Sequence, residues 1–142
     1  SVNGSKWKAK TTPLYHGKAT TGIYSISSSG NGKIMAVGGD YTKVDSSYYP
    51  IISLNDGRSW LKTKGMVSGY RSVIDYCKEG NFWLCGGTNG LELSADDGKT
   101  WNPFSSQDIN TLRFLPNTTK AIAANGKGEI FSLDIKMTNR KN

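Results

Sequence analysis

The chain has little of what a metal or redox centre requires. It contains one histidine and two cysteines, Cys77 and Cys85, and no two cysteines are separated by two residues. Structural zinc sites draw four ligands from closely spaced cysteines and histidines, so we expect no metal site and no cofactor. A turn at 79–80 would pair Cys77 with Phe82 or Trp83 across a hairpin. We therefore predict free, buried thiols, because a disulfide needs Cβ atoms about 4 Å apart.

Long apolar runs are also missing. No stretch approaches the roughly 18 residues of a membrane-spanning helix, so we expect a chain that does not cross a membrane. No 3.6-residue hydrophobic period is present, which argues against helices. The chain starts without Met and without a signal-like apolar segment, so we expect a mature form or a fragment.

Acidic residues are scarce at the two ends of the chain, and this produces the net charge of +7. Residues 1–18 hold four lysines and no acid, whereas the body, 19–135, balances 11 basic against 11 acidic residues. A nucleic-acid-binding domain would carry a basic stripe on its folded body. We therefore expect solvated basic ends and no nucleic-acid partner.

Glycine and aromatic residues are plentiful, and one eight-residue pattern organises them. S-x-D-x-G-x-x-W spans 94–101 and, with Asn in the acidic position, 53–60. In such a turn a short Asp or Asn side chain accepts backbone N–H bonds, and glycine takes a positive φ. The hydroxyl can tie the two arms together, and the Trp ring can pack against the neighbouring unit. The residues given this structural role are Ser53, Asn55, Gly57, Trp60, Ser94, Asp96, Gly98 and Trp101.

The pattern repeats about every 40 residues. Its two copies lie 41 residues apart, and a degraded third copy begins at Ser132. Each copy ends a strand, two further strands are expected upstream of it, and a fourth strand is expected to start at Trp60 and at Trp101. A period of about 40–45 residues with four strands per unit is typical of propeller blades. The predicted fold is all-β, with about three four-stranded antiparallel blades of a β-propeller, either partial or half of a six- to seven-bladed ring.

We expect a single partial propeller domain over 1–142. Its predicted units are a blade remnant over 5–18 and blades over 22–64, 69–106 and 109–136. Lys6–Lys10 resembles a fourth strand without its first three, and the last blade lacks a fourth strand. Because three blades cannot close a ring, missing blades or a homodimer would complete it through the open edges at Lys6–Lys10 and 129–135.

These motifs resemble the Asp-box (BNR-repeat) β-propellers. Together with the two Asp boxes, Gly38-Gly39-Asp40-Tyr41 and Gly69-Tyr70-Arg71-Ser72 resemble the carboxy-terminal blades of the photosystem II stability/assembly-factor-like family, over about residues 6–135. The resemblance implies a non-enzymatic scaffold or assembly-factor-like protein that binds a protein partner. We expect a periplasmic or extracellular bacterial location. Members of the family are often named oxidoreductases, but no glycine-rich βα turn for a dinucleotide is present.

The alternative is a carbohydrate-binding or sialidase-like propeller fragment. Sialidases use an arginine triad with a Tyr nucleophile, and only two of the four arginines, Arg71 and Arg113, fall at strand-one positions. Other glycoside hydrolases need two facing carboxylates, and no pair has a spacing that demands catalysis. We therefore assign no catalytic residue and expect no enzyme.

The candidate binding residues lie in a long link between two strands of the first full blade and just before the second blade. Long loops are often functional, and alternating strand direction places these two segments on one face, opposite the Asp boxes. Arg71 offers a fork of donors to a partner carboxylate, and tyrosines add contact area. Alternatively, Arg71 pairs internally with Asp40 and only ties two blades together. The assigned binding residues are Asp40, Tyr41, Tyr48, Tyr49, Tyr70 and Arg71.

Overall fold

The computed structural model describes residue 4, residues 6–136 and residue 138, and every regular element in this part of the chain is a β-strand. Three antiparallel sheets form, in the orders β1-β2-β3-β4, β5-β6-β7-β8 and β11-β10-β9. The strands are β1 (Thr21–Ser28), β2 (Ile34–Asp40), β3 (Ile51–Ser53), β4 (Leu61–Lys62), β5 (Val73–Cys77), β6 (Phe82–Gly87), β7 (Gly90–Ser94), β8 (Asn102–Ser105), β9 (Thr111–Phe114), β10 (Lys120–Ala124) and β11 (Ile130–Asp134). The described part of the chain contains no helix with the length and apolarity needed to span a bilayer.

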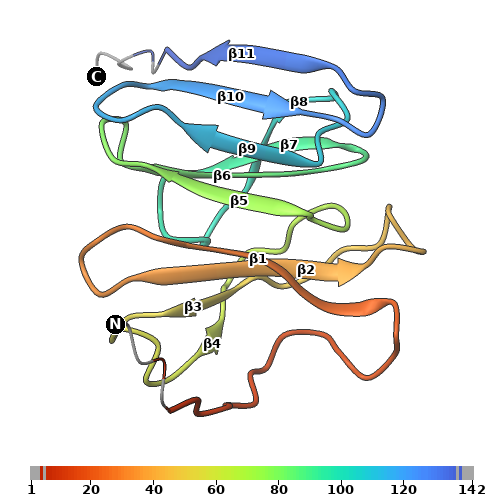
Figure 1. Ribbon diagram of the computed structural model, residues 1–142, viewed down its shortest axis with the longest axis vertical. Coiled ribbons are helices and arrows are strands. Elements are labelled where there is room, and N and C mark those ends of the chain that lie inside the picture. The colour runs from red at the N-terminus through yellow and green to blue at the C-terminus, as the bar shows by residue number, and fades with distance from the viewer. Residues whose placement is uncertain (1–3, 5, 137, 139–142) are drawn as a thin grey trace.

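The first strands of the three sheets, β1, β5 and β9, lie beside one another, and the sheets stack in a row (Figure 1). Asp75 on β5 joins them. Its carboxylate accepts a hydrogen bond from the Ser27 hydroxyl at 2.9 Å and one from the backbone N–H of Phe114 at 2.9 Å. One partly buried side chain thereby links all three sheets, as expected for blades arranged around an axis.

The two predicted box turns share one geometry. In the second, the Ser94 hydroxyl donates to Asp96 at 2.9 Å and accepts from the Gly98 N–H at 2.8 Å, while the Thr100 N–H donates to Asp96 at 2.9 Å. Gly98 has φ 78° and Asp97 φ 57°, so the expected positive φ at glycine is confirmed. The first turn makes the corresponding three bonds among Ser53, Asn55, Gly57 and Ser59.

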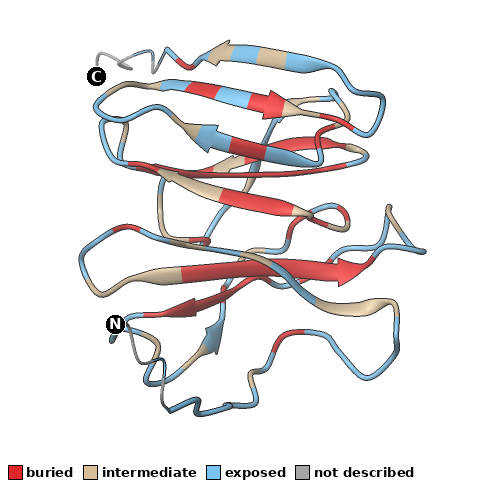
Figure 2. Cartoon of the chain, in the orientation of Figure 1, coloured by how far each residue is buried: buried red, intermediate tan, exposed pale blue. Residues whose placement is uncertain are grey.

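The hydrophobic core lies between the sheets, and burial is concentrated in β2, β3, β5, β6 and β7 (Figure 2). One cluster, which includes Met35, Ile74 and Trp83, joins the first and second sheets, and Trp101 packs against it. Trp60 packs instead beside Leu14, which comes from the segment before β1. Both box tryptophans therefore pack into clusters that include residues from outside their own sheet.

The cysteines behave as predicted. Cys77 lies opposite Phe82 in the β5–β6 ladder, and both Cys77 and Cys85 are free and buried. Burial raises the pKa of Cys85 to about 12. The thiolate is the reactive form of cysteine, so this thiol is a packing group.

The predicted amino-terminal strand is wrong. Lys6–Lys10 forms no strand, and Trp7 is 96% exposed. A lone strand has no ladder to join, because its backbone groups need a paired neighbour. The segment is attached by single contacts instead, such as the Lys10 ammonium to the Arg58 carbonyl at 2.5 Å. Ser5, the first residue of the predicted remnant, lies outside the described residues.

Candidate functional site

The link between β2 and β3 starts at Asp40, which organises the loop from inside. Its carboxylate accepts hydrogen bonds from the Thr42 N–H at 3.0 Å and the Thr42 hydroxyl at 2.6 Å. Asp40 is only 1% exposed, and the Thr42 hydroxyl bond is the main reason that the pKa of this carboxyl lies below its usual range. Asp40 thus shapes the loop, and its oxygens are not presented at the surface.

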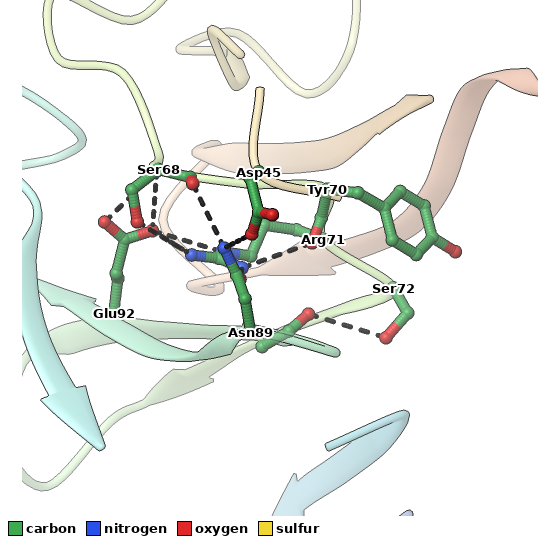
Figure 3. Close-up of polar contacts among 8 residues, drawn as sticks. Asp45, Ser68, Tyr70, Arg71, Ser72, Asn89 and Glu92 are labelled. Atoms are coloured by element: carbon green, nitrogen blue, oxygen red, sulfur yellow. Dashed lines mark hydrogen bonds and ion pairs between the residues drawn. The ribbon is translucent and has the colours of Figure 1, made fainter. Parts of the chain in front are cut away.

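Arg71 is also buried, and its ion-pair partner is Glu92 on β7 (Figure 3). Its Nε donates to Glu92 Oε2 at 3.1 Å, Nη2 donates to the same oxygen, and Nη1 donates to Asn89 Oδ1 at 2.5 Å. The alternative pairing of Arg71 with Asp40 is therefore wrong, since Asp40 is occupied by Thr42. Because only 1% of the Arg71 surface is exposed, its guanidinium N–H donors are not accessible to a partner.

Glu92 was not among the predicted site residues, although its position in the sequence is informative. Glu92 lies between Leu91 and Leu93 in a strand that the pattern makes apolar. Acidic side chains are seldom fully buried unless they are paired, so a carboxylate in that strand required a cation close by. Arg71 was the strand-one arginine of the same blade.

The polar network around Arg71 holds the segment that leads into β5. The Ser68 N–H donates to both Glu92 oxygens, at 3.0 and 3.2 Å, and Asn89 Nδ2 donates to the Ser68 carbonyl at 3.1 Å. Beside it, the Tyr70 N–H donates to the Val44 carbonyl at 3.0 Å, from the long loop. The two segments predicted to share a face do so, and they are fastened to each other.

Three tyrosines meet above this network, and we call Tyr24, Tyr41 and Tyr70 the tyrosine cluster. Ring centroids lie 5.1 Å apart for Tyr24–Tyr70, 6.2 Å for Tyr24–Tyr41 and 6.5 Å for Tyr41–Tyr70, all in edge-to-face geometry. Tyr24 and Tyr41 are 40% and 48% exposed. Partial burial, and then the neighbouring phenols, raise the pKa of Tyr24 and Tyr70, so these phenols remain protonated donors at neutral pH. Tyr24, on β1, was not among the predicted residues.

Tyr48 and Tyr49 lie apart from the cluster and line a pocket of about 290 Å³. Tyr48 packs against Tyr15 at 5.7 Å between centroids, and the Lys62 ammonium lies 5.6 Å above the Tyr49 ring. Lys43, Ser46 and Ser47 complete the wall. The six predicted binding residues therefore fall into three groups: Tyr41 and Tyr70 in the cluster, Tyr48 and Tyr49 in the pocket, and Asp40 and Arg71 in the supporting interior.

The two arginines considered for catalysis have structural partners. Arg71 is paired with Glu92. Arg113 Nη1 lies 3.4 Å from Asp75 Oδ1, and the Asp75 carboxylate also accepts the hydrogen bonds from Ser27 and Phe114. Within residues 6–136, no three His, Cys, Asp or Glu side chains are grouped so that they could hold a metal ion. The arrangement on this face is suited to contact with a ligand through rings, hydroxyls and ammonium groups.

The sequence matches no protein-family model and no curated protein. Solved structures, in contrast, share its fold. The WD40 β-propeller domain of Doa1 superposes with a TM-score of 0.58 at 13% identity, over 87% of this chain and 40% of that one. Sqt1 from Saccharomyces cerevisiae gives 0.59 at 14% identity, over 89% and 35%. YCF48, solved bound to D1 peptide, gives 0.59 at 18% identity, over 95% and 45%.

These likenesses show the fold: the chain consists of β-propeller blades. It spans less than half the length of the propellers it matches, 35% to 45%. The three sheets lie in a row with their first strands, β1, β5 and β9, side by side, which is the arrangement expected of part of a propeller ring (Figure 1).

Proposed function

We propose that this chain is a non-enzymatic propeller scaffold that binds a protein partner through the tyrosine cluster. The observation that carries the proposal is the arrangement of Tyr24, Tyr41 and Tyr70, three partly exposed rings that pack edge to face. Hydrogen bonds hold the segment beneath them in place. Tyrosine supplies a large amphipathic contact area and loses few rotamers on binding. Because this hydrogen-bonded segment is ordered before any partner binds, the entropic cost of association is lower.

Similar architecture supports this assignment. Among the matched propellers, YCF48 was solved bound to D1 peptide, so one protein of this fold takes a peptide ligand. The resemblance of the box turns and the Gly-Tyr-Arg-Ser segment to photosystem II assembly-factor-like propellers points in the same direction. We extend the proposal to an assembly-factor-like role in a periplasmic or extracellular setting, in a ring completed by further blades or by a second copy.

A site-specific photo-crosslink tests the protein-partner assignment. Tyr41 is replaced by p-benzoylphenylalanine in the protein expressed in its source cells, and Phe104, which is 42% exposed, is replaced in the same way as a control. We expect a discrete covalent adduct from position 41 and none from position 104. Equal adducts from both positions, or none from position 41, would contradict the proposal.

Carbohydrate binding is the second candidate, and the pocket beside Tyr49 favours it. Aromatic rings that can stack on a sugar face, next to hydroxyl and ammonium donors, are a usual lining for small polar ligands. A glycan array with the wild-type chain and Tyr49→Ala separates the two functions. Specific glycan signals lost in Tyr49→Ala would support carbohydrate binding, whereas a blank array leaves the protein partner as the better assignment.

A further inference from the structure

A second surface lies on the side of the box turns, where the outer strands of the first sheet meet the second box turn. We call it the basic groove. It has a volume of about 400 Å³, and its walls come from β3 and β4, the segment after β4, and the turn that carries Asp97 and Lys99. None of the six predicted binding residues lines it.

The groove has an apolar floor that is open to solvent. Leu54 and Leu61 are 59% and 62% exposed, although each lies beside the buried strand residue Ile52. Large apolar side chains gathered in one depression and rimmed by polar groups mark interaction sites more often than single exposed residues do. The floor is therefore a candidate for a partner's apolar side chain.

The rim is positively charged. Four lysines, Lys33, Lys62, Lys64 and Lys99, and a single carboxylate, Asp97, line the groove. The Lys62 ammonium lies over the Tyr49 ring of the other pocket, so the remaining three lysines and Asp97 leave a net charge of +2. Charges balance over residues 19–135 as a whole, so this excess is local.

The one carboxylate in the groove is already occupied. Asp97 accepts from the Lys33 ammonium at 2.5 Å and from the Trp83 indole at 3.1 Å. Burial tends to raise its pKa, but these two bonds, together with the positive charges of Lys33 and Lys99, outweigh burial, so the pKa lies below its usual range and the group stays ionised. Lys64 and Lys99, both exposed, are left facing solvent without a carboxylate partner among the described residues.

The walls are fixed in position. The Gly65 N–H donates to the Gly98 carbonyl at 2.8 Å, which joins the segment after β4 to the box turn. Gly98 packs so closely on Thr63 that a Cβ on Gly98 would lie 2.5 Å from the Thr63 methyl. The backbone of the segment that carries Leu61 and Lys64 is therefore held at a set distance from the box turn that carries Lys99 before any ligand binds.

The strand along the groove has a free edge. β4 pairs with β3 through Leu61 and Lys62, and no further described strand pairs with its other side. Unpaired backbone groups on an edge strand accept an added strand, and an extended peptide can supply one. Side chains of an extended segment alternate, so apolar groups can face the floor while acidic groups face the rim.

We propose that the basic groove binds an extended acidic segment of a partner protein, with apolar side chains on Leu54 and Leu61 and carboxylates toward Lys64 and Lys99. Charge complementarity selects this occupant. The chain's own ends are basic and would be repelled, since residues 1–18 carry four lysines and the last residues include Lys136, Arg140 and Lys141. The groove adds a second interaction surface, independent of the tyrosine cluster.

A peptide-display selection tests the proposal. The immobilised chain is presented with random twelve-residue peptides, and the enriched peptides are measured by fluorescence polarisation. We expect enriched peptides with net negative charge and at least one large apolar residue, and an affinity that falls as NaCl rises because the contacts are between exposed charges. Enrichment of uncharged or basic peptides, or no enrichment above background, would overturn the proposal.

Two double variants with the same change in charge locate the site. Lys64→Glu/Lys99→Glu should weaken the acidic peptides at least tenfold, whereas Lys18→Glu/Lys127→Glu, at exposed lysines away from the groove, should leave affinity within about twofold. Leu61→Ser should weaken binding without removing its salt dependence. Equal binding by both double variants, or loss in Tyr41→Ala instead, would show that the peptides occupy another surface. Circular dichroism melts confirm that each variant is folded.

Discussion

Arg71 and Glu92 form an ion pair in which the two side chains are 1% and 6% exposed. It lies beneath the tyrosine cluster and joins β7 to the segment before β5. The pair supports the loop face from inside and is not part of that face. The positions of the cluster rings therefore depend on a buried electrostatic contact that is not itself exposed.

Arg71→Ala should destabilise the fold strongly. It leaves the Glu92 carboxylate buried without its cation, and breaking a buried pair in this way typically costs about 3–5 kcal/mol. Urea denaturation measures the loss of free energy of unfolding. Arg58→Ala, at an exposed box-turn position, is the control and should change it by less than about 0.5 kcal/mol. Similar midpoints for the two variants would contradict the structural role of the pair.

Asp96→Ala should lower stability moderately. It removes the acceptor of the Ser94 hydroxyl and of both Thr100 donors, so we expect a loss of about 1–2 kcal/mol. Thermal melts measure it, and binding at the tyrosine cluster should persist once the protein is folded. Binding abolished at an unchanged melting temperature would show that the box turn contacts the ligand, against our prediction.

Acid should weaken the fold through Asp96 and Asp97. Burial alone would raise both pKa values, but hydrogen bonds from Thr100 and Ser94, and from Lys33 and Trp83, bring them below the usual range. A lowered folded-state pKa means that the contribution to stability is complete above the unfolded value, about 3.9, and is lost as pH falls through the folded value.

Melting temperatures between pH 6 and pH 2.5 test this prediction. We expect them to fall below about pH 4, with a shallower fall in Asp96→Asn/Asp97→Asn because those carboxylates no longer titrate. Parallel curves for the wild type and the variant would show that other carboxylates control acid unfolding.

Both thiols should be unreactive toward thiol reagents in the native state. Burial raises the pKa of Cys85 to about 12 and also raises that of Cys77, so the thiolate fraction at pH 8 is very small. A disulfide reagent such as DTNB should report no fast-reacting thiol at pH 8 and two after addition of guanidinium. Rapid modification of native protein would indicate local opening of β5 or β6.

The third sheet should self-associate when no further blade covers it. Ile130 is 76% exposed and Ile122 is 40% exposed, and no described strand pairs with the outer edge of β11. Light scattering at rising concentration should show dimers, and Ile130→Lys should remove them while Lys127→Glu does not. A wild-type monomer at high concentration would count against completion of the ring by a second copy.

Local chemistry accounts for most of the fold. The turn residues Ser94, Asp96 and Gly98 make their bonds within five positions of sequence, so the residue types alone predict the geometry of the turn. The same holds for the Cys77–Phe82 register, which a short turn dictates. The prediction of a strand at Lys6–Lys10 was wrong because strand formation depends on a neighbour that the pattern of one segment cannot supply.

The sequence by itself determined that the chain forms propeller blades, since turn chemistry and a 40-residue period act over short distances. Tertiary structure alone decided which side chains face outward. Arg71 turned inward because Glu92 lies across the blade, and Tyr24 joined Tyr41 and Tyr70 because β1 lies beside the segment before β5. The basic groove likewise required the first sheet to meet the second box turn, a contact between residues about 30 or more positions apart that no local pattern encodes.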